Sequence, residues 1–313
     1  MTKAIMIRIV IVLVGILLVL LGRGLFCYRG FYTPPPPRLP SYEHITVPQA
    51  PSGEFYDEIT EGEGIVLIDL AHKNSFEIEE LNVLMLRLIS RDMTVRFLDA
   101  DDDLGQELIG KEILEEKAEE ADQNGEAASK PKEEPEEEEV AKELPDAFVI
   151  VCPGAEFSAE ERGAISEFVE GGGKLLLIAD PTRQSRLNSL SFDFGLLFEP
   201  DYLYNLKEND INYRNIYITR FVENEITEDL AKIVLYTAGS ISSVDGGIAM
   251  VDENTFSSLI ETRRELSPIA LTEEARVLAV SDLTFMTEPY NGAHDNNRLI
   301  ANIADWLASP VEE

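Results

Sequence analysis

The sequence predicts an α/β domain with a mainly parallel sheet and helices on both faces, preceded by one transmembrane helix. Three observations support this prediction. An unbroken apolar run lies at Ile9–Leu21. Farther along the chain, short apolar segments alternate with stretches of helical periodicity. Short, continuously apolar strands between helices are typical of a parallel sheet that is covered on both faces.

Residues 1–30 are predicted to form a transmembrane anchor. Ala4–Gly22 is apolar apart from Arg8, and such a helix extends about 28 Å, close to the hydrocarbon thickness of a bilayer. A cleaved signal peptide is the alternative, but the small residues that a cleavage site needs are missing around Gly24–Cys27. We therefore expect an uncleaved, single-pass anchor in the cell membrane.

The charges beside the apolar run leave the orientation open. Lys3 and Arg8 lie on one side, and Arg23, Arg29 and Arg38 lie on the other. Counting these residues mildly favours a cytoplasmic domain. An N-terminal anchor followed by a large domain more often exports that domain, so we expect an extracytoplasmic location.

Residues 31–54 form the predicted linker, in which Pro34–Pro37 is typical of a stiff polyproline spacer. The folded domain is predicted at residues 55–309. The chain has 26 basic and 59 acidic residues, a net charge of -33. This charge repels nucleic acid and anionic headgroups and favours basic partners. We therefore expect protein partners in a membrane complex and no nucleic acid.

The first half of the domain contains four predicted strands and two predicted helices. The strands are Gly64–Leu70, Thr94–Leu98, Ala147–Cys152 and Lys174–Ala179. One helix has an apolar face that includes Ile78, Leu81, Leu84, Met85, Leu88 and Ile89. The other helix begins at the capping box Ser158–Glu161 and ends at Gly171–Gly173.

An acidic insert interrupts this pattern at about residues 112–145. Residues 112–143 contain 14 acidic and 4 basic residues, with almost no large apolar residue after Leu114. Such a segment cannot bury enough apolar surface to order itself, so we expect it to be disordered. It is either a solvating loop or a docking site for a basic partner or cations.

The second half has a less regular pattern until its end. Strands are predicted at Asn212–Phe221, Lys232–Ala238 and Arg276–Ser281, and the last helix follows Asp295 or Asn296 as its cap. A Tyr/Asn-rich stretch consists of Tyr202, Tyr204, Asn205, Asn209, Asn212, Tyr213 and Asn215. These residues suit turns and sheet surfaces, and they also suit polar ligand or protein contacts.

Three segments carry a resemblance to a known family: IDLAHKNSF at 68–76, DAFVIVCPGAEFSAEERGAISEFVEGGGKLLLIADPTR at 146–183, and RVLAVSDLTFMTEPYNGAHDNNRLIANIADWL at 276–307. They resemble the class I glutamine amidotransferase-like domains of uncharacterised bacterial and archaeal membrane-anchored proteins. Similar domains occur in accessory proteins of gliding-motility ABC transporters. The resemblance covers about residues 55–309 without the insert, and it implies a flavodoxin-like fold.

The resemblance does not extend to the glutaminase machinery. Class I amidotransferases carry a nucleophilic Cys in a G-x-C-x-G turn after a strand, with a His-Glu pair later. The corresponding turn here is Ile178–Pro181, where Asp180 stands in place of the Cys and the glycines are missing. Cys152 is followed by Pro153 and does not match, and no His-x-Glu pair follows the last strand. The resemblance therefore implies the fold with no catalytic residue and no cofactor.

Polar side chains should gather at the carboxyl ends of the parallel strands, where such sheets bind ligands. They form four groups: Asp69, His72 and Asn74; Asp180 and Arg183; Asp282 and Thr284; His294, Asp295 and Asn296. His and Asp are suitable metal ligands, but their spacing matches no metal motif, so no metal site is predicted. Structural roles are the alternative, with Asn74 and Glu77 as a helix cap, Asp282 binding loop amides and Asp295 or Asn296 capping the last helix.

The leading hypothesis for function is a membrane-tethered, non-catalytic binding or scaffold module of an envelope or transporter-associated complex. The rival hypothesis is a hydrolase that uses Asp69, His72, Asp180 and His294 around a metal or a water molecule. Converging carboxylates and imidazoles at the strand ends would favour the hydrolase, whereas capped helices and a shallow surface would favour the binding module.

Overall fold

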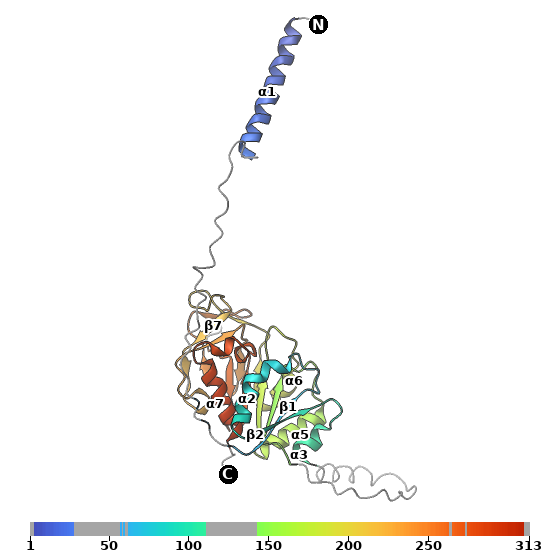
Figure 1. Cartoon of the computed structure of the whole chain (residues 1–313), viewed down its shortest axis with the longest axis vertical. Helices are drawn as coiled ribbons and strands as arrows, with labels where there is room; N and C mark the ends of the chain where they lie inside the picture. The colour runs from blue at the N-terminus through green and yellow to red at the C-terminus, as the bar shows by residue number, and fades with distance from the viewer. Residues whose placement is uncertain are drawn as a thin grey trace, which may run out of the picture. The chain divides into compact units, whose positions relative to one another are not determined.

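The computed structural model describes residues 3–27, 57, 59, 62–110, 143–262, 265–272 and 274–309. The chain divides into two compact units, Met1–Gln49 and Ala50–Glu313. In the first unit the helix α1 spans Lys3–Cys27 (Figure 1). Its length and composition suit a membrane span, a property that a signal sequence shares. The predicted N-terminal apolar helix is confirmed, while the predicted linker lies outside the described residues.

A six-stranded sheet forms the centre of the second unit (Figure 1). The strand order is β13-β14-β4-β3-β1-β2, and all neighbours are parallel except the pair β13–β14. The strands are β1 (Gly64–Asp69), β2 (Met93–Leu98), β3 (Ala147–Val151), β4 (Lys174–Ile178), β13 (Ile269–Leu271) and β14 (Val277–Val280). The predicted mainly parallel sheet is therefore confirmed.

Helices cover both faces of this sheet. In β1, Val66 and Ile68 belong to one core cluster and Leu67 to another, because successive strand side chains point to opposite faces. The first cluster includes residues of α2 and α7, which lie side by side in Figure 1, and the second includes residues of α3 and α5. These helices are α2 (Asn82–Ser90), α3 (Leu104–Ile109), α5 (Ala159–Glu170) and α7 (Asn296–Ala308).

Local sequence signals explain several helix boundaries. In the predicted capping box of α5, Ser158 Oγ accepts from Glu161 N at 3.2 Å and Ser158 N donates to Glu161 Oε2 at 2.7 Å. The helix predicted from Ile78 begins as the short 3-10 helix η2 (Ile78–Leu81). Ile78 and Ile89, the first and last residues of the predicted apolar face, are exposed and do not belong to that face.

Helix α3 was not predicted, because its six residues are too short to show a periodicity. Its first turn is capped by Asp103, whose Oδ1 accepts from Gln106 N at 3.0 Å. The predicted acidic insert follows α3, and its residues 112–142 lie outside the described part of the chain.

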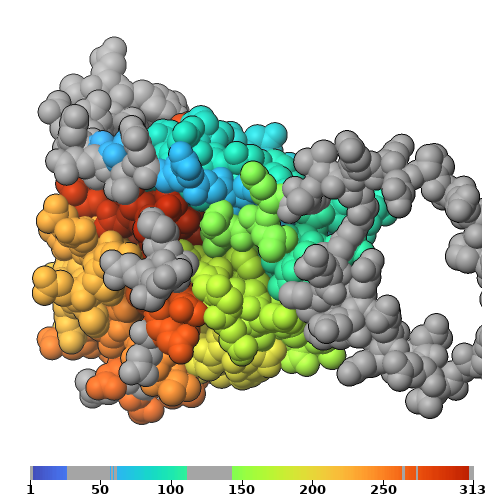
Figure 2. Space-filling view, turned by 90° about the horizontal axis from the view of Figure 1, so that it is seen from below, coloured from blue at the N-terminus to red at the C-terminus, as the bar shows by residue number. Residues whose placement is uncertain are grey.

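Small antiparallel strand pairs form between β4 and β13. They are β5 (Leu196–Phe198) with β10 (Ile241–Ser243), β6 (Leu203–Asn205) with β12 (Thr255–Ser257), β7 (Asn215–Ile218) with β9 (Ile233–Tyr236), and β8 (Arg220–Phe221) with β11 (Ala249–Met250). The short helices of this half are α6 (Asn188–Ser191), η3 (Phe192–Phe194), η4 (Glu225–Thr227), η5 (Thr284–Met286) and η6 (Tyr290–Gly292). The two predicted middle strands correspond to β7–β8 and β9. Figure 2 shows the yellow and orange segments on one side of this unit and the cyan and green segments on the other.

A buried arginine joins α2 to α7. Arg91 is fully buried, and its Nε and Nη2 donate to Asp305 Oδ1 and Oδ2 at 2.6 and 2.8 Å. Its Nη2 also donates to Asp57 Oδ1 at 2.8 Å, and Asp57 pairs with Arg87 as well. Asp57 and Asp305 thus neutralise a guanidinium that water cannot reach, and this network fixes the two helices to each other.

Candidate functional site

The first predicted group, at the carboxyl end of β1, forms a closed hydrogen-bond network. Asp69 is fully buried, and its Oδ1 lies 2.9 Å from Nδ1 of His72. Asn74 Nδ2 donates to Asp69 Oδ2 at 3.0 Å and to the carbonyl of Val151 at 2.9 Å. The prediction that Asn74 caps a helix was wrong, because its side chain instead joins the loop after β1 to the end of β3.

His72 lies between two carboxylates. Its Nε2 is 3.4 Å from Oε1 of Glu161, and its ring stacks on Phe157 with 3.9 Å between the centroids. Burial lowers the pKa of His72, but the hydrogen bond and charge of Asp69, followed by those of Glu161, outweigh burial and raise the pKa above its usual value. Glu161 therefore has two roles, since it also belongs to the capping box of α5.

We expect the stabilising effect of His72 to depend on pH. Because the folded-state pKa is raised, protonated His72 should add stability that is fully present below the unfolded-state pKa of about 6.5 and lost as the pH rises through the folded-state pKa. Urea unfolding of the wild type and of His72→Gln between about pH 5.5 and about pH 9 tests this. The stability difference should be largest at the acidic end, and a difference that is constant or grows with pH would contradict the assignment.

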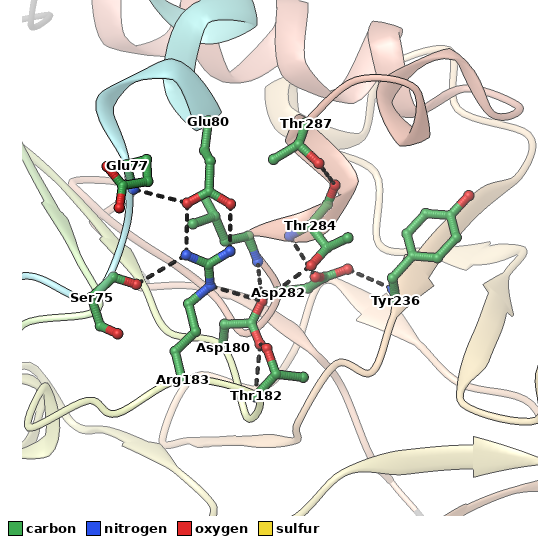
Figure 3. Close-up of polar contacts among 11 residues, drawn as sticks. Ser75, Glu77, Glu80, Asp180, Thr182, Arg183, Tyr236, Asp282, Thr284 and Thr287 are labelled. Atoms are coloured by element: carbon green, nitrogen blue, oxygen red, sulfur yellow. Dashed lines mark hydrogen bonds and ion pairs between the residues drawn. The ribbon is translucent and has the colours of Figure 1, made fainter.

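The second and third groups lie together at the carboxyl ends of β4 and β14 (Figure 3). Asp180 is buried, and its Oδ1 accepts from the backbone N and the hydroxyl of Thr182 at 2.8 and 2.5 Å. Its Oδ2 accepts from Leu283 N at 3.3 Å and from the hydroxyl of Thr284 at 3.4 Å. Asp180 therefore joins the loops that follow two neighbouring strands.

Arg183 connects this group to the loop after β1. Figure 3 shows its guanidinium facing the carboxylate of Glu80, with the two bonds at 2.7 and 2.5 Å. Arg183 Nη1 also donates to the carbonyl of Ser75 at 3.0 Å, while its Nε is 3.9 Å from Asp180 Oδ2. The ion pair with Arg183 lowers the pKa of Glu80. The sequence pattern did not identify Glu80 as a site residue, because around that position it indicated only the start of a helix.

Asp282 is fully buried and binds backbone amides, as predicted. Its Oδ2 accepts from Tyr236 N at 2.6 Å, and its Oδ1 accepts from Thr284 N at 2.8 Å (Figure 3). Burial, together with the nearby charge of Asp180, raises the pKa of Asp282 well above its usual value. The carboxylate therefore serves the fold, since its oxygens accept from the amide of β9 and from the loop after β14.

The fourth group serves β9 and the residues before it in the same way. Asp295 Oδ2 accepts from the backbone N of Ala231 and of Lys232, both at 2.8 Å. Asn296 is fully buried, and its amide accepts from Val234 N at 3.0 Å and donates to Val234 O at 2.9 Å. Asp295 is the N-cap residue of α7, one of the two predicted positions, but its side chain makes no cap bond to the helix.

His294 lies in a different cluster from His72. Its ring packs edge-on against Tyr217, with 5.3 Å between the centroids. Burial and the charge of Lys232 lower the pKa of His294. The residues of the rival hydrolase hypothesis are therefore divided between three networks: Asp69 and His72 after β1, Asp180 after β4, and His294 before α7. Within the described residues no group of three or more His, Cys, Asp or Glu could hold a metal ion.

Cys152 follows β3 in a left-handed backbone conformation, with φ of 42°. A residue other than glycine adopts this conformation at a cost, and such sites occur at the turns that carry nucleophiles. The side chain is fully buried, and burial raises the pKa of the thiol to about 12, with the charge of Asp180 as the next cause. Cys152 is one of eight described non-glycine residues with a positive φ, and it follows β3, whereas the family resemblance indicated the turn of Asp180 after β4.

A cavity of about 380 Å³ adjoins the second group. Its lining includes Asp180, Arg183, Asp201, Tyr202 and Ser240. Most of these polar groups are already paired; for example, Asp201 accepts from the backbone N and the hydroxyl of Ser240, both at 2.8 Å. A larger cavity of about 750 Å³ lies at the amino ends of the strands, and none of the predicted site residues lines it.

No family model matches this chain, and no curated protein matches it. Among solved structures, the mmIFT52 N-terminal domain is similar, with 14% identity and a TM-score of 0.57 over 79% of this chain and 99% of that one. At this identity the likeness shows the fold alone.

Two further solved structures match less closely. A ThuA-like protein from Parabacteroides merdae has 10% identity and a TM-score of 0.40, covering 80% of this chain and 92% of that one. Alpha-L-fucosidase isoenzyme 2 from Paenibacillus thiaminolyticus has 11% identity and a TM-score of 0.37, covering 79% of this chain and 32% of that one. Neither of these likenesses is close enough to support an inference about function.

Proposed function

We propose that this chain is a membrane-tethered, non-catalytic binding or scaffold module of an envelope or transporter-associated complex, with its folded domain outside the cytoplasm. The apolar helix α1 supports the tether. The acidic composition of the chain supports a protein partner with basic residues rather than a nucleic acid.

One observation carries the non-catalytic part of the proposal: the polar groups at the strand ends are engaged by the fold itself. Asp180 and Asp282 accept bonds from the loops and from β9, and Arg183 is paired with Glu80. The thiol of Cys152 is buried and has a raised pKa, so it is protonated at neutral pH, whereas a nucleophilic cysteine must be a thiolate. The site therefore has no ready nucleophile of the kind that an amidotransferase uses.

The order of the parallel strands supports a flavodoxin-like fold and a relationship to amidotransferase-like domains. From one edge the parallel strands run β2-β1-β3-β4-β14, which is the order 2-1-3-4-5 of flavodoxin-like sheets. The left-handed residue Cys152 after β3 also supports an origin from a fold with a nucleophile turn. We propose a domain that kept this architecture without the chemistry.

A hydrolase is the second candidate, and one observation favours it. Asp69 orients His72 through Nδ1, as a carboxylate orients the general base of a hydrolase. The ring is only 5% exposed and stacks on Phe157. The free approach to Nε2 is blocked by Glu161, which a substrate would have to displace, and this makes the hydrolase the weaker candidate.

The tether makes a direct prediction for membrane fractionation. We expect the full-length protein to remain in the pellet after carbonate washing, because the apolar run Ile9–Leu21 is long enough to cross the bilayer. A chain that starts near Ser52 should appear in the supernatant. A mature N-terminus found beyond Gly30 by terminal sequencing would show a cleaved signal peptide and exclude the tether.

The buried thiol makes a prediction for chemistry. The purified full-length protein should release no ammonia from glutamine above the background of a heat-denatured control. Cys152→Ser should keep the fold, since the two side chains are similar in size. Glutamine hydrolysis by the wild type that disappears in Cys152→Ser would overturn the non-catalytic proposal.

A further inference from the structure

One surface of the second unit carries an uncovered set of aromatic rings. Along β6 the burial alternates: Leu203 and Asn205 are buried, whereas Tyr204 is half-buried. In β12, Phe256 lies directly opposite Tyr204 and is 37% exposed. Because directly paired residues of an antiparallel pair point to the same face, the outer side of this two-stranded sheet is aromatic.

Neighbouring residues extend this surface, which we call the aromatic face and define as Tyr202, Tyr204, Tyr213, Phe256 and Arg214. The ring of Tyr204 has its centroid 6.3 Å from Tyr202, 6.4 Å from Tyr213 and 6.0 Å from Phe256. Tyr213 is 42% exposed. The Tyr/Asn-rich stretch of the sequence therefore forms an exposed patch of the kind that is enriched in protein interfaces.

The aromatic face already binds one guanidinium. Arg214 lies over the ring of Tyr202 at 4.3 Å and over that of Tyr213 at 5.5 Å, both within the range of a cation–π interaction. No cation among the described residues stacks on Tyr204 or Phe256. These two adjacent rings therefore offer a similar surface to a cation from another molecule.

The charge around the aromatic face selects the partner. Residues 199–265 contain 13 acidic and 6 basic residues, and Glu208, Glu253 and Glu261 are exposed. A second copy of this acidic chain would be repelled, and so would anionic lipid headgroups. A basic segment would be attracted by the acidic surroundings and could place guanidinium groups on the rings.

We propose that the aromatic face binds an arginine-bearing basic segment of a protein partner, with Tyr204 and Phe256 as the stacking platform. This inference rests on the proposed binding role and names the surface and the partner chemistry. Arginine is preferred to lysine because its planar guanidinium stacks on aromatic rings, while both residues carry the same charge.

The test measures peptide binding to the full-length protein in phosphatidylcholine nanodiscs by fluorescence anisotropy. The probes are two labelled peptides of about twelve residues, alternating Arg with Ser or Lys with Ser, at about 0.15 M salt. The Arg peptide should bind more tightly than the Lys peptide. Tyr204→Ala and Phe256→Ala should each weaken binding of the Arg peptide about 3- to 10-fold. Tyr204→Phe, which keeps the ring, should bind the peptide as the wild type does.

Phe192→Ala is the matched control, because Phe192 is 59% exposed and lies in η3, outside the aromatic face. It should leave binding unchanged. If Tyr204→Ala fails to fold, Phe256→Ala tests the proposal, since the ring of Phe256 is more exposed and its removal disturbs the fold less. Equal binding of the two peptides, unchanged binding in Phe256→Ala, or an equal loss in Phe192→Ala would each overturn the proposal.

Two other occupants would also be detected. Self-association in sedimentation velocity that disappears in Phe256→Ala would assign the aromatic face to a second copy. Binding to phosphatidylserine vesicles that depends on Phe256 would assign it to the membrane surface. Either result overturns the peptide proposal, whereas carbonate extraction and the glutaminase assay test the proposed function separately.

Discussion

Replacement of Arg91 by Met is expected to destabilise the folded domain by about 3 kcal/mol. The guanidinium is fully buried and binds Asp305 through two nitrogens and Asp57 through another bond. Its removal leaves Asp57 with Arg87 alone and Asp305 without its counter-charge. Because these carboxylates are 23% and 31% exposed, water can solvate them in part, which keeps the effect at the lower end of the usual range.

Urea unfolding of the full-length protein in detergent measures this effect. Trp306 is the only tryptophan of the chain and is 1% exposed, so its fluorescence reports on the packing of α7. Arg186→Met is the matched control, because Arg186 and its partner Glu156 are 56% and 68% exposed; it should change stability by about 0.5 kcal/mol or less. Arg91→Lys should not restore stability, since lysine cannot bind both carboxylates in the same geometry. Equal stability of Arg91→Met and the wild type would show that the network is not a structural determinant.

Replacement of Asn296 by Ala is expected to cost about 3 kcal/mol, because each buried polar group left unpaired costs about 1–3 kcal/mol. The amide of Asn296 pairs with both the N–H and the carbonyl of Val234 and also donates to the carbonyl of Tyr290. It therefore replaces a neighbouring strand at the edge of β9. Loss of the amide leaves these backbone groups without a partner in a site that water does not reach.

Asn296→Asp distinguishes the hydrogen bonds from the size of the side chain. The carboxylate can still accept from Val234 N, but it cannot donate to Val234 O and it buries a charge, so this variant should also be destabilised. Asn82→Ala is the control, since Asn82 is exposed at the start of α2, and it should change stability by about 0.5 kcal/mol or less. A loss below about 1 kcal/mol in Asn296→Ala would mean that the edge of β9 finds other partners.

The strands and helices whose pattern is local were predicted well from the sequence. The strands β1, β3 and β4 are continuous apolar runs that are buried on both faces, and the capping box of Ser158 marks the start of α5. The elements that were missed are short. Helix α3 and the strands β5, β6, β10, β11, β12 and β13 have two to six residues each, so their periodicity is too brief to distinguish from that of a loop.

The sequence predicted where the site residues lie, at the carboxyl ends of the strands. The role of each side chain depends on the groups it bonds to, which come from distant parts of the chain. Asp69 and His72 do lie together, because they are only three positions apart at the end of one strand. Asp295 and Asn74 are residue types that often cap helices, yet their side chains bind the segment just before β9 and the end of β3. Sequence patterns cannot distinguish these alternatives, since Asn and Asp side chains bond any nearby backbone amide.

By itself the sequence determined the apolar N-terminal helix, the parallel α/β class and the acidic character of the chain, because each depends on local composition or periodicity. Only the tertiary structure decided which side chains meet. Arg91 binds Asp305, which is 214 positions away in the sequence. Arg183 binds Glu80 at a separation of 103 positions, and Asn296 binds Val234 at a separation of 62 positions. Such pairs form because the order of the strands and the packing of the helices bring distant segments together, and both are properties of the tertiary structure rather than of any local pattern.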